Sequence, residues 1–133
     1  IVGEVNADGL ELAFAAFLEA APDVQAFGKN YMAVGFRIEY VRGNGELSTY
    51  TPDFLVRTTD GVVWVVETKG REELDLPQKM GRLRQWCEDA TDATKNDGGP
   101  RYKFVYVDQE SFEKHKPSSF AALASTFREY QEI

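Results

Sequence analysis

Two acidic residues and one lysine fall where a buried strand is expected. Asp53 is followed fourteen residues later by Glu67-Thr68-Lys69, which ends the apolar run Val62–Val66. Side chains alternate along a strand, so Glu67 and Lys69 should share a face. A hairpin between the two segments places Asp53 on the neighbouring strand. The spacing therefore predicts that two carboxylates and an ammonium group converge.

Such a group has a definite chemistry. Buried carboxylates are costly unless they are paired or bind a metal. Mg²⁺ prefers one or two carboxylates and several waters, which suits Asp53, Glu67 and the backbone carbonyl of Thr68 as ligands, with Mn²⁺ as a substitute. We expect Asp53, Glu67 and Lys69 to be catalytic in metal-assisted phosphodiester hydrolysis, with Lys69 positioning the water. The alternative is a cross-strand ion pair beside a turn aspartate.

Other charged residues are candidates for supporting roles. Glu11 borders an apolar helical stripe, and with Asp8 it forms an acid-x-x-Glu pattern that is typical of a helix cap. Lys79 falls on the inward side of a predicted helix and either reaches a substrate phosphate or extends its ammonium to solvent. Three arginines either contact DNA or form a solvated face: Arg71, Arg82 and Arg84.

The elements that must position these residues follow from periodicity. Helical spacing predicts helices over 9–20, from Pro77 to about Thr94, and from Phe120 to Tyr130 with Ser118 or Ser119 as cap. Strands are expected over 32–40, 48–58, 62–66 and 102–107, with turns at 42–45 and 59–61 and a loop at 96–100. The result is an α/β (α+β mixed) fold with a four-stranded mixed sheet, in the order αβββαβ plus a C-terminal helix.

Composition limits the class of protein. With 133 residues, 43% of them hydrophobic, we expect one domain over 1–133. A single cysteine, Cys87, and one histidine cannot build a disulfide or a zinc site, and no run of eighteen apolar residues predicts a membrane span. A cytoplasmic location is expected. The first residue is Ile1 and not methionine, so we expect a segment of a longer protein or a processed product.

The charge is acidic overall but unevenly placed. A net charge of −7 argues against a free-standing nucleic-acid coat protein, since such proteins bind mainly by neutralising phosphates. Residues 69–84 nevertheless carry five basic side chains against three acidic ones. Neighbouring parts of a longer protein are expected to supply most of the DNA affinity.

The motifs resemble a known superfamily. Pro52-Asp53 with Glu67-x-Lys69, set between a first helix and a following helix and strand, is similar to the PD-(D/E)XK nucleases. More narrowly, three segments resemble the C-terminal cleavage domain of type III restriction enzyme Res subunits, and the likeness covers about residues 8–107. The segments are Tyr50-Thr51-Pro52-Asp53-Phe54, Val65-Val66-Glu67-Thr68-Lys69-Gly70-Arg71-Glu72 and Trp86-Cys87-Glu88-Asp89-Ala90.

This resemblance implies a restriction-endonuclease-like core and a Mg²⁺-dependent endonuclease that cuts double-stranded DNA. Some members of the superfamily have a glutamate of the first helix near the active site, so Glu11 is either such an accessory acidic group or only part of the helix cap with Asp8. It further implies an ATP-dependent helicase or translocase region in the same polypeptide and a methyltransferase subunit as partner. The chain itself has no GKS/T phosphate loop. Two alternatives stay open: a DNA repair or recombination nuclease of the same fold, and an inactive nuclease fold used for DNA binding or assembly.

Overall fold

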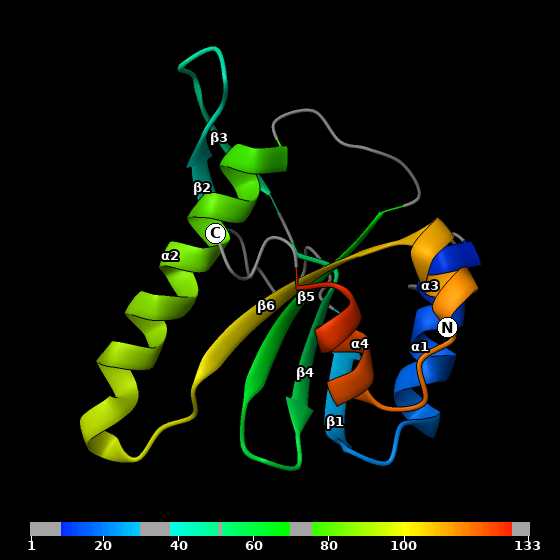
Figure 1. Cartoon of the computed structure of the whole chain (residues 1–133). Helices are drawn as coiled ribbons and strands as arrows, with labels where there is room; N and C mark the ends of the chain where they lie inside the picture. The colour runs from blue at the N-terminus through cyan, green and yellow to red at the C-terminus, as the bar shows by residue number, and fades with distance from the viewer. Residues whose placement is uncertain (1–8, 30–37, 51, 70–75, 129–133) are drawn as a thin grey trace.

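The computed structural model describes residues 9–29, 38–50, 52–69 and 76–128, with side chains for all of these except residues 9–11, 50, 69 and 109. Figure 1 shows the elements in chain order: α1 (Gly9–Ala20), β1 (Val24–Lys29), β2 (Ile38–Val41), β3 (Leu47–Tyr50), β4 (Phe54–Thr58), β5 (Val63–Lys69), α2 (Leu76–Thr94), the short 3₁₀ helix η2 (Lys95–Asp97), β6 (Tyr102–Asp108), α3 (Gln109–His115) and α4 (Phe120–Thr126).

The main sheet is mixed and has four strands in the order β1-β4-β5-β6. β4 runs antiparallel to both β1 and β5, whereas β5 and β6 are parallel. A tight turn can join only antiparallel strands, so the parallel pair needs the crossover that contains α2. The predicted four-stranded mixed sheet is confirmed. The apolar run at 62–66 supplies the first half of β5, which lies between β4 and β6, and such a run is expected for a strand that is buried on both faces.

The first strand of this sheet does not follow from the sequence pattern. β1 has Gly28 and Lys29 at its end, two residue types that are depleted in strands. Its pairing with β4 also shifts register between Val24 and Ala26, so apolar side chains do not alternate regularly. The alternation at 32–40 predicts a strand instead. Residues 32–37 lie outside the described residues, and Ile38–Val41 pairs with β3 rather than with the main sheet.

The single strand predicted over 48–58 is wrong. The structure has two strands there, β3 and β4, separated around Pro52. Proline has no N–H to donate to a strand ladder, so the pairing is interrupted at this point. β3 instead forms a two-stranded sheet with β2, joined by a turn in which the Gly45 N–H donates to the Arg42 carbonyl at 2.9 Å. The hairpin between β4 and β5 lies at 59–61 as predicted.

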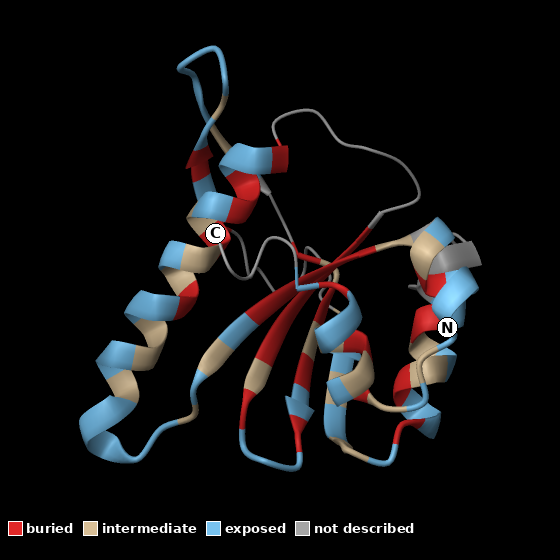
Figure 2. Ribbon diagram, viewed as in Figure 1, coloured by how far each residue is buried: buried red, intermediate tan, exposed pale blue. Residues whose placement is uncertain are grey.

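Helices cover both faces of the main sheet (Figures 1 and 2). One face, here called the α2 face, packs against α2 and β2. The other, the α1 face, packs against α1, α3 and α4. The α2-face core consists of Ile38, Tyr40, Val65, Leu76, Met80, Leu83, Cys87, Phe104 and Tyr106. The α1-face core consists of Phe14, Leu18, Phe54, Val56, Val62, Trp64, Val66, Val105, Val107, Phe112, Phe120, Leu123 and Phe127.

The predicted helices are largely confirmed. α1 and α2 match the expected ranges within one residue, and α4 starts at Phe120 with the Ser119 hydroxyl accepting from the Ala122 N–H at 3.1 Å. α4 ends at Thr126, before the predicted Tyr130. α3 was not predicted, because the sequence of its seven residues, QESFEKH, contains a single large apolar residue, Phe112, and so shows no helical period. No helix in the described part is long and apolar enough to cross a membrane.

Candidate active site

The acidic residues of the predicted site lie at the ends of two adjacent strands. Phe54 of β4 is paired with Val66 of β5, and Asp53 and Glu67 are the next residues outward on each side. The Asp53 N–H donates to the Val66 carbonyl at 3.0 Å, which holds Asp53 against β5 although it lies just outside β4. The structure therefore places Asp53 and Glu67 as neighbours across the two strands.

The Asp53 carboxylate is held by Thr68. Its Oδ2 accepts from the Thr68 N–H at 2.8 Å and from the Thr68 hydroxyl at 2.9 Å. That N–H belongs to the peptide that links Glu67 to Thr68, so the carboxylate of Asp53 is attached to the backbone of Glu67. Within the described residues Oδ1 of Asp53 has no hydrogen-bond partner. One oxygen is thus used for positioning, and the other is available to a ligand.

Glu67 lies much deeper than Asp53. Its side chain is only 2% exposed, because β5 has a strand on each side and a helix over the face that Glu67 shares with Val65. Tyr106 of β6 is in register beside it. Ionised carboxylates are rarely buried to this degree unless they are paired or bind a cation. Glu67 is the residue of this site with the strongest physical requirement for a positive partner.

The structure locates Lys69 only through its backbone. It is the last residue of β5 and is in register with Asp108 of β6. Its side chain and that of Glu11 are outside the described part, and Arg71 lies in a range that is not described. The roles assigned to these three residues remain predictions.

Thr68 contributes more than was predicted for it. The sequence pattern indicated only its carbonyl, as a metal ligand. The N–H and C=O of one strand residue point to the same side of the strand, so this carbonyl faces the Asp53 side of β5. The unpredicted feature is the hydroxyl, which is buried and donates to Asp53. The only sign of this hydrogen bond in the sequence was the presence of a threonine between Glu67 and Lys69.

Lys79 is buried on the inward side of α2, as its spacing predicted. Its side chain is 9% exposed, and Nζ lies 5.5 Å from the centre of the Tyr40 ring of β2. An ammonium above an aromatic face is attracted by the ring quadrupole, and more strongly when both are removed from water. The β2–β3 hairpin therefore helps to hold Lys79 between α2 and the sheet, and the ammonium does not extend freely to solvent.

Arg82 and Arg84 are both half-buried on α2. Arg84 forms a salt bridge with Glu88 at 3.5 Å, one helical turn away, which is a common arrangement on a solvated helix surface. One guanidinium nitrogen of Arg82 is buried and has no hydrogen-bond partner among the described residues. Arg84 is accordingly the weaker of the two candidates for a DNA contact.

The donor set suits a hard cation that binds oxygen better than a metal that prefers nitrogen or sulfur ligands, such as zinc. Within the described ranges no three His, Cys, Asp or Glu side chains are grouped to hold a metal. Asp53, Glu67 and one carbonyl form a smaller, all-oxygen set, and Mg²⁺ is commonly bound by one or two carboxylates while it keeps several waters. The residues present therefore fit Mg²⁺ or Mn²⁺.

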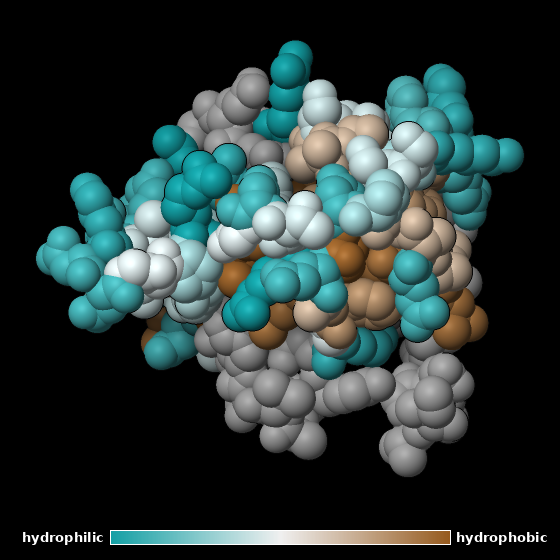
Figure 3. All heavy atoms as spheres, turned by 90° about the horizontal axis from the view of Figure 1, so that it is seen from below, coloured by the Kyte–Doolittle hydropathy of each residue, from teal (hydrophilic) through white to brown (hydrophobic). Residues whose placement is uncertain are grey.

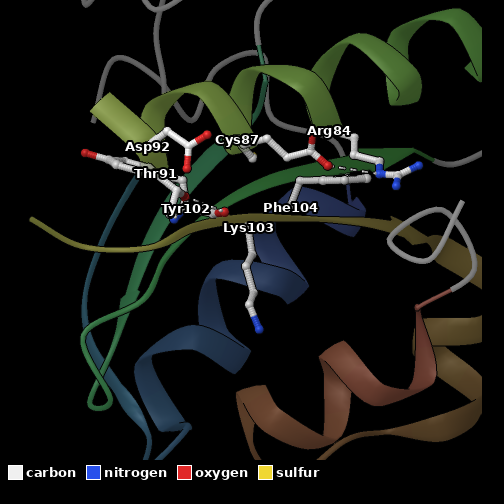
Figure 4. Close-up of a pocket in the computed structure, with 8 residues that line it drawn as sticks. Arg84, Cys87, Thr91, Asp92, Tyr102, Lys103 and Phe104 are labelled. Atoms are coloured by element: carbon white, nitrogen blue, oxygen red, sulfur yellow. Dashed lines mark hydrogen bonds and ion pairs between the residues drawn. The ribbon is translucent and has the colours of Figure 1, made fainter. Parts of the chain in front are cut away.

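The cavity between α2 and the outer edge of β6 is not part of this site (Figure 4). It has a volume of about 560 Å³, and Cys87 and Phe104 are among its lining residues. The charges that line it include Arg84 and Glu88, which pair with each other, while Lys103 points away through the sheet toward Trp64. The other acidic residue of its lining, Asp92, belongs to α2 and not to the strand ends.

Comparisons with protein-family models, with characterised proteins and with solved structures found no match to this chain. The resemblance described above accordingly depends on the motifs themselves and on their placement at the strand ends.

Proposed function

We propose that this chain is a Mg²⁺-dependent deoxyribonuclease domain whose reactive centre is the strand-end pair of Asp53 and Glu67. The observation that carries the proposal is the attachment of the Asp53 carboxylate to Thr68, the residue after Glu67, whose backbone N–H and hydroxyl both donate to it. This contact holds two acidic residues in adjacent positions at the rim of the sheet. Open α/β sheets characteristically bind ligands at the carboxyl ends of their parallel strands, which is where Glu67 and Lys69 lie.

The topology gives further support. Without the β2–β3 hairpin, the order is α1, β1, β4, β5, α2, β6, that is helix, three strands, helix, strand. This is the order of the PD-(D/E)XK core that the motifs resemble, with the hairpin as an insertion. A restriction-endonuclease-like fold is therefore part of the proposal.

Each residue has a separate role in the proposed reaction. Asp53, Glu67 and the Thr68 carbonyl would hold the ion, which when bound lowers the pKa of a coordinated water and stabilises charge on the phosphoryl oxygens. Thr68 positions Asp53 through its N–H and hydroxyl. Lys69 is assigned to orient the attacking water, and Lys79, held by Tyr40, is the candidate for contact with a substrate phosphate.

We further propose a type III-like restriction setting, on the motifs alone. In that setting the substrate is double-stranded DNA in the cytoplasm, a translocase region belongs to the same polypeptide, and a methyltransferase subunit is the partner. A repair or recombination nuclease would use the same residues. The net charge of −7 favours a different class, an inactive module for assembly.

The test combines metal binding with cleavage. Mn²⁺ and Mg²⁺ binding is measured by calorimetry, and plasmid nicking by gel assay, for the wild type, Asp53→Asn, Glu67→Gln and Lys69→Ala. Asp92→Asn, which changes a carboxylate on α2 far from the strand ends, is the matched control. The first two variants should lose metal binding and cleavage together. Lys69→Ala should bind metal normally and cleave about 10²–10⁴-fold more slowly.

Two results would contradict the proposal. Cleavage at the wild-type rate by any of the three site variants would show that the active site lies elsewhere. Failure of the wild type to bind either metal or to nick DNA would favour the assembly module.

A further inference from the structure

A second cavity lies at the opposite end of the sheet from Asp53 and Glu67. Arg57 is paired with Val63 near the β4–β5 hairpin, four residues along the chain from Asp53. At ~3.3 Å per strand residue, the two ends are about 13 Å apart. The cavity has a volume of about 480 Å³ and is bordered by β1, this hairpin and the loop before β6. Figure 3 looks onto this end of the molecule, where hydrophilic side chains are spread between exposed hydrophobic atoms.

Two arginines from different elements line the cavity. Arg57 belongs to β4, and Arg101 directly precedes β6. Within the described part of the chain neither arginine forms a salt bridge. Arginine presents planar pairs of N–H donors that match the oxygens of phosphate, so two such groups at one cavity favour a bridging oxyanion.

One carboxylate, Asp60, also lines the cavity, but the turn already engages it. Its Oδ1 accepts from the Thr58 hydroxyl at 2.5 Å and from the Val62 N–H at 3.3 Å. The hydrogen bond from Thr58 is the main cause that lowers the pKa of Asp60, with a smaller contribution from the charge of Arg101. Asp60 is therefore ionised at neutral pH, and the cavity carries two positive charges against one negative charge.

Two of the glycines that line the cavity lie in the loop before β6. Gly98 has a left-handed φ of 73°, which side chains other than glycine rarely adopt. Gly99 donates its N–H to the Thr94 carbonyl, and a Cβ at Gly99 would collide with the Thr94 side chain. A larger side chain is therefore disfavoured at Gly98 by the backbone conformation and at Gly99 by Thr94, which keeps the loop before Arg101 in this conformation.

We propose that this cavity binds a phosphoryl group between Arg57 and Arg101, with the Gln25 amide as a further donor. The chain as a whole is strongly acidic, so a local excess of positive charge here is not part of a general basic surface. The group belongs either to a small phosphate compound or to the backbone of a nucleic acid. The inference does not depend on the proposed nuclease activity, because none of these residues belongs to the strand-end site.

The test is a titration of the ¹⁵N-labelled 133-residue chain followed by NMR. Inorganic phosphate is added at constant ionic strength against chloride, and the amides of Gly61, Gly98 and Gly99 are monitored. A separate titration uses a short DNA duplex in metal-free buffer, which prevents cleavage. The variants are Arg57→Gln, Arg101→Gln and Asp60→Asn, with Lys114→Gln on α3 as the charge-matched control.

Saturable shifts are expected, with binding weakened about tenfold by either arginine substitution and unchanged by Lys114→Gln. Asp60→Asn keeps an oxygen acceptor for the turn and removes a repelling charge, so it should tighten binding. Shifts with the duplex identify a nucleic acid as the source, and shifts with phosphate alone identify a small compound. The proposal is overturned if neither titration saturates, or if both arginine variants bind like the wild type.

Discussion

The carboxylate of Asp53 has two roles, and the residue type alone does not tell them apart. As a proposed metal ligand it contributes negative charge, and as a hydrogen-bond acceptor it satisfies the buried N–H and hydroxyl of Thr68. A buried donor that loses its acceptor costs more than the hydrogen bond contributes. The two functions can therefore be distinguished by the choice of substitution.

Asp53→Ala should lower the free energy of unfolding by about 1–3 kcal/mol without metal, because two donors of Thr68 lose their acceptor. Asp53→Asn keeps an oxygen acceptor and should cost less, while it still removes the charge needed by the ion. Thr68→Val removes only the hydroxyl, so it should cost about 1 kcal/mol and leave metal binding intact. Urea unfolding with and without Mg²⁺ measures all three. Equal stability of Asp53→Ala and the wild type would show that this contact does not stabilise the fold.

At the scale of the elements, the short helix α4 depends on a distant residue. Asp23, in the connection between α1 and β1, accepts from the Phe120 N–H at 2.7 Å and from the Ala121 N–H at 2.9 Å. The Asp23 carbonyl also accepts from the Thr59 N–H of the β4–β5 hairpin. Seven residues are too few for a stable isolated helix, so α4 requires such contacts.

Asp23→Ala should lower the free energy of unfolding by about 1–2 kcal/mol, the usual range for loss of an N-terminal cap. It should also speed hydrogen exchange at Phe120 and Ala121 more than in α2, because the effect is local to α4. Asp92→Ala serves as the control, since Asp92 lies within α2 and caps no helix. Unchanged exchange in α4 would mean that packing of Phe120 and Leu123 alone holds the helix.

Two glycines of the α2 region should respond in opposite ways to alanine. Gly81 lies inside α2 and is exposed, and a methyl group added there would have no other atom within 4 Å. Gly81→Ala should therefore stabilise the protein by about 0.5–1 kcal/mol through helix propensity and reduced freedom of the unfolded chain. Gly99→Ala forces a methyl group against Thr94 and should destabilise by about 1–3 kcal/mol. Thermal unfolding compares them, and the same sign for both would contradict the packing described for the loop.

For the molecule as a whole, the net charge limits the affinity for DNA, and core packing limits the reactivity of the one cysteine. With a net charge of −7 the chain alone should bind DNA weakly, and that binding should fall steeply with salt.

Its one cysteine, Cys87, is 4% exposed in the α2-face core. Burial, with a smaller effect of Glu88, raises the pKa of the thiol from its ordinary 9.0 to about 12.

Native Cys87 should react with iodoacetamide at pH 8 only at the rate at which the protein opens, because the thiolate is the reactive form. In urea the reaction should be complete within minutes. Above pH 9 the thiol ionises in the unfolded chain, while the native thiol keeps its proton. The contribution of Cys87 to the free energy of unfolding is therefore complete below pH 9 and is lost as the pH rises toward about 12. Cys87→Ala should show a smaller fall. Mass spectrometry follows the labelling, and rapid modification of the native protein would contradict the burial of this residue.

The sequence alone determined the elements whose signal is local. The spacing of apolar residues within a short stretch of sequence was enough to predict α1, α2, β5 and β6. The same spacing indicated Asp53, Glu67 and Lys79, because charged residues stand out among apolar ones. Neighbours within a helix or strand carry this information, so no tertiary contact is needed to read it. The roles proposed for these residues remain predictions.

Only the tertiary structure decided which segments meet. Four contacts join segments that are distant along the chain: β1 with β4 at the edge of the sheet, the Thr68 hydroxyl with Asp53, Lys79 with Tyr40, and Asp23 with α4. Tertiary pairing also decided that β2 and β3 form a sheet of their own. A hydrogen bond between residues 97 positions apart leaves no local pattern, because its partners become neighbours only after the strands pair and the helices pack. The geometry of the candidate site is of this kind, since Asp53 and Thr68 are fifteen residues apart and are brought into contact by the β4–β5 hairpin.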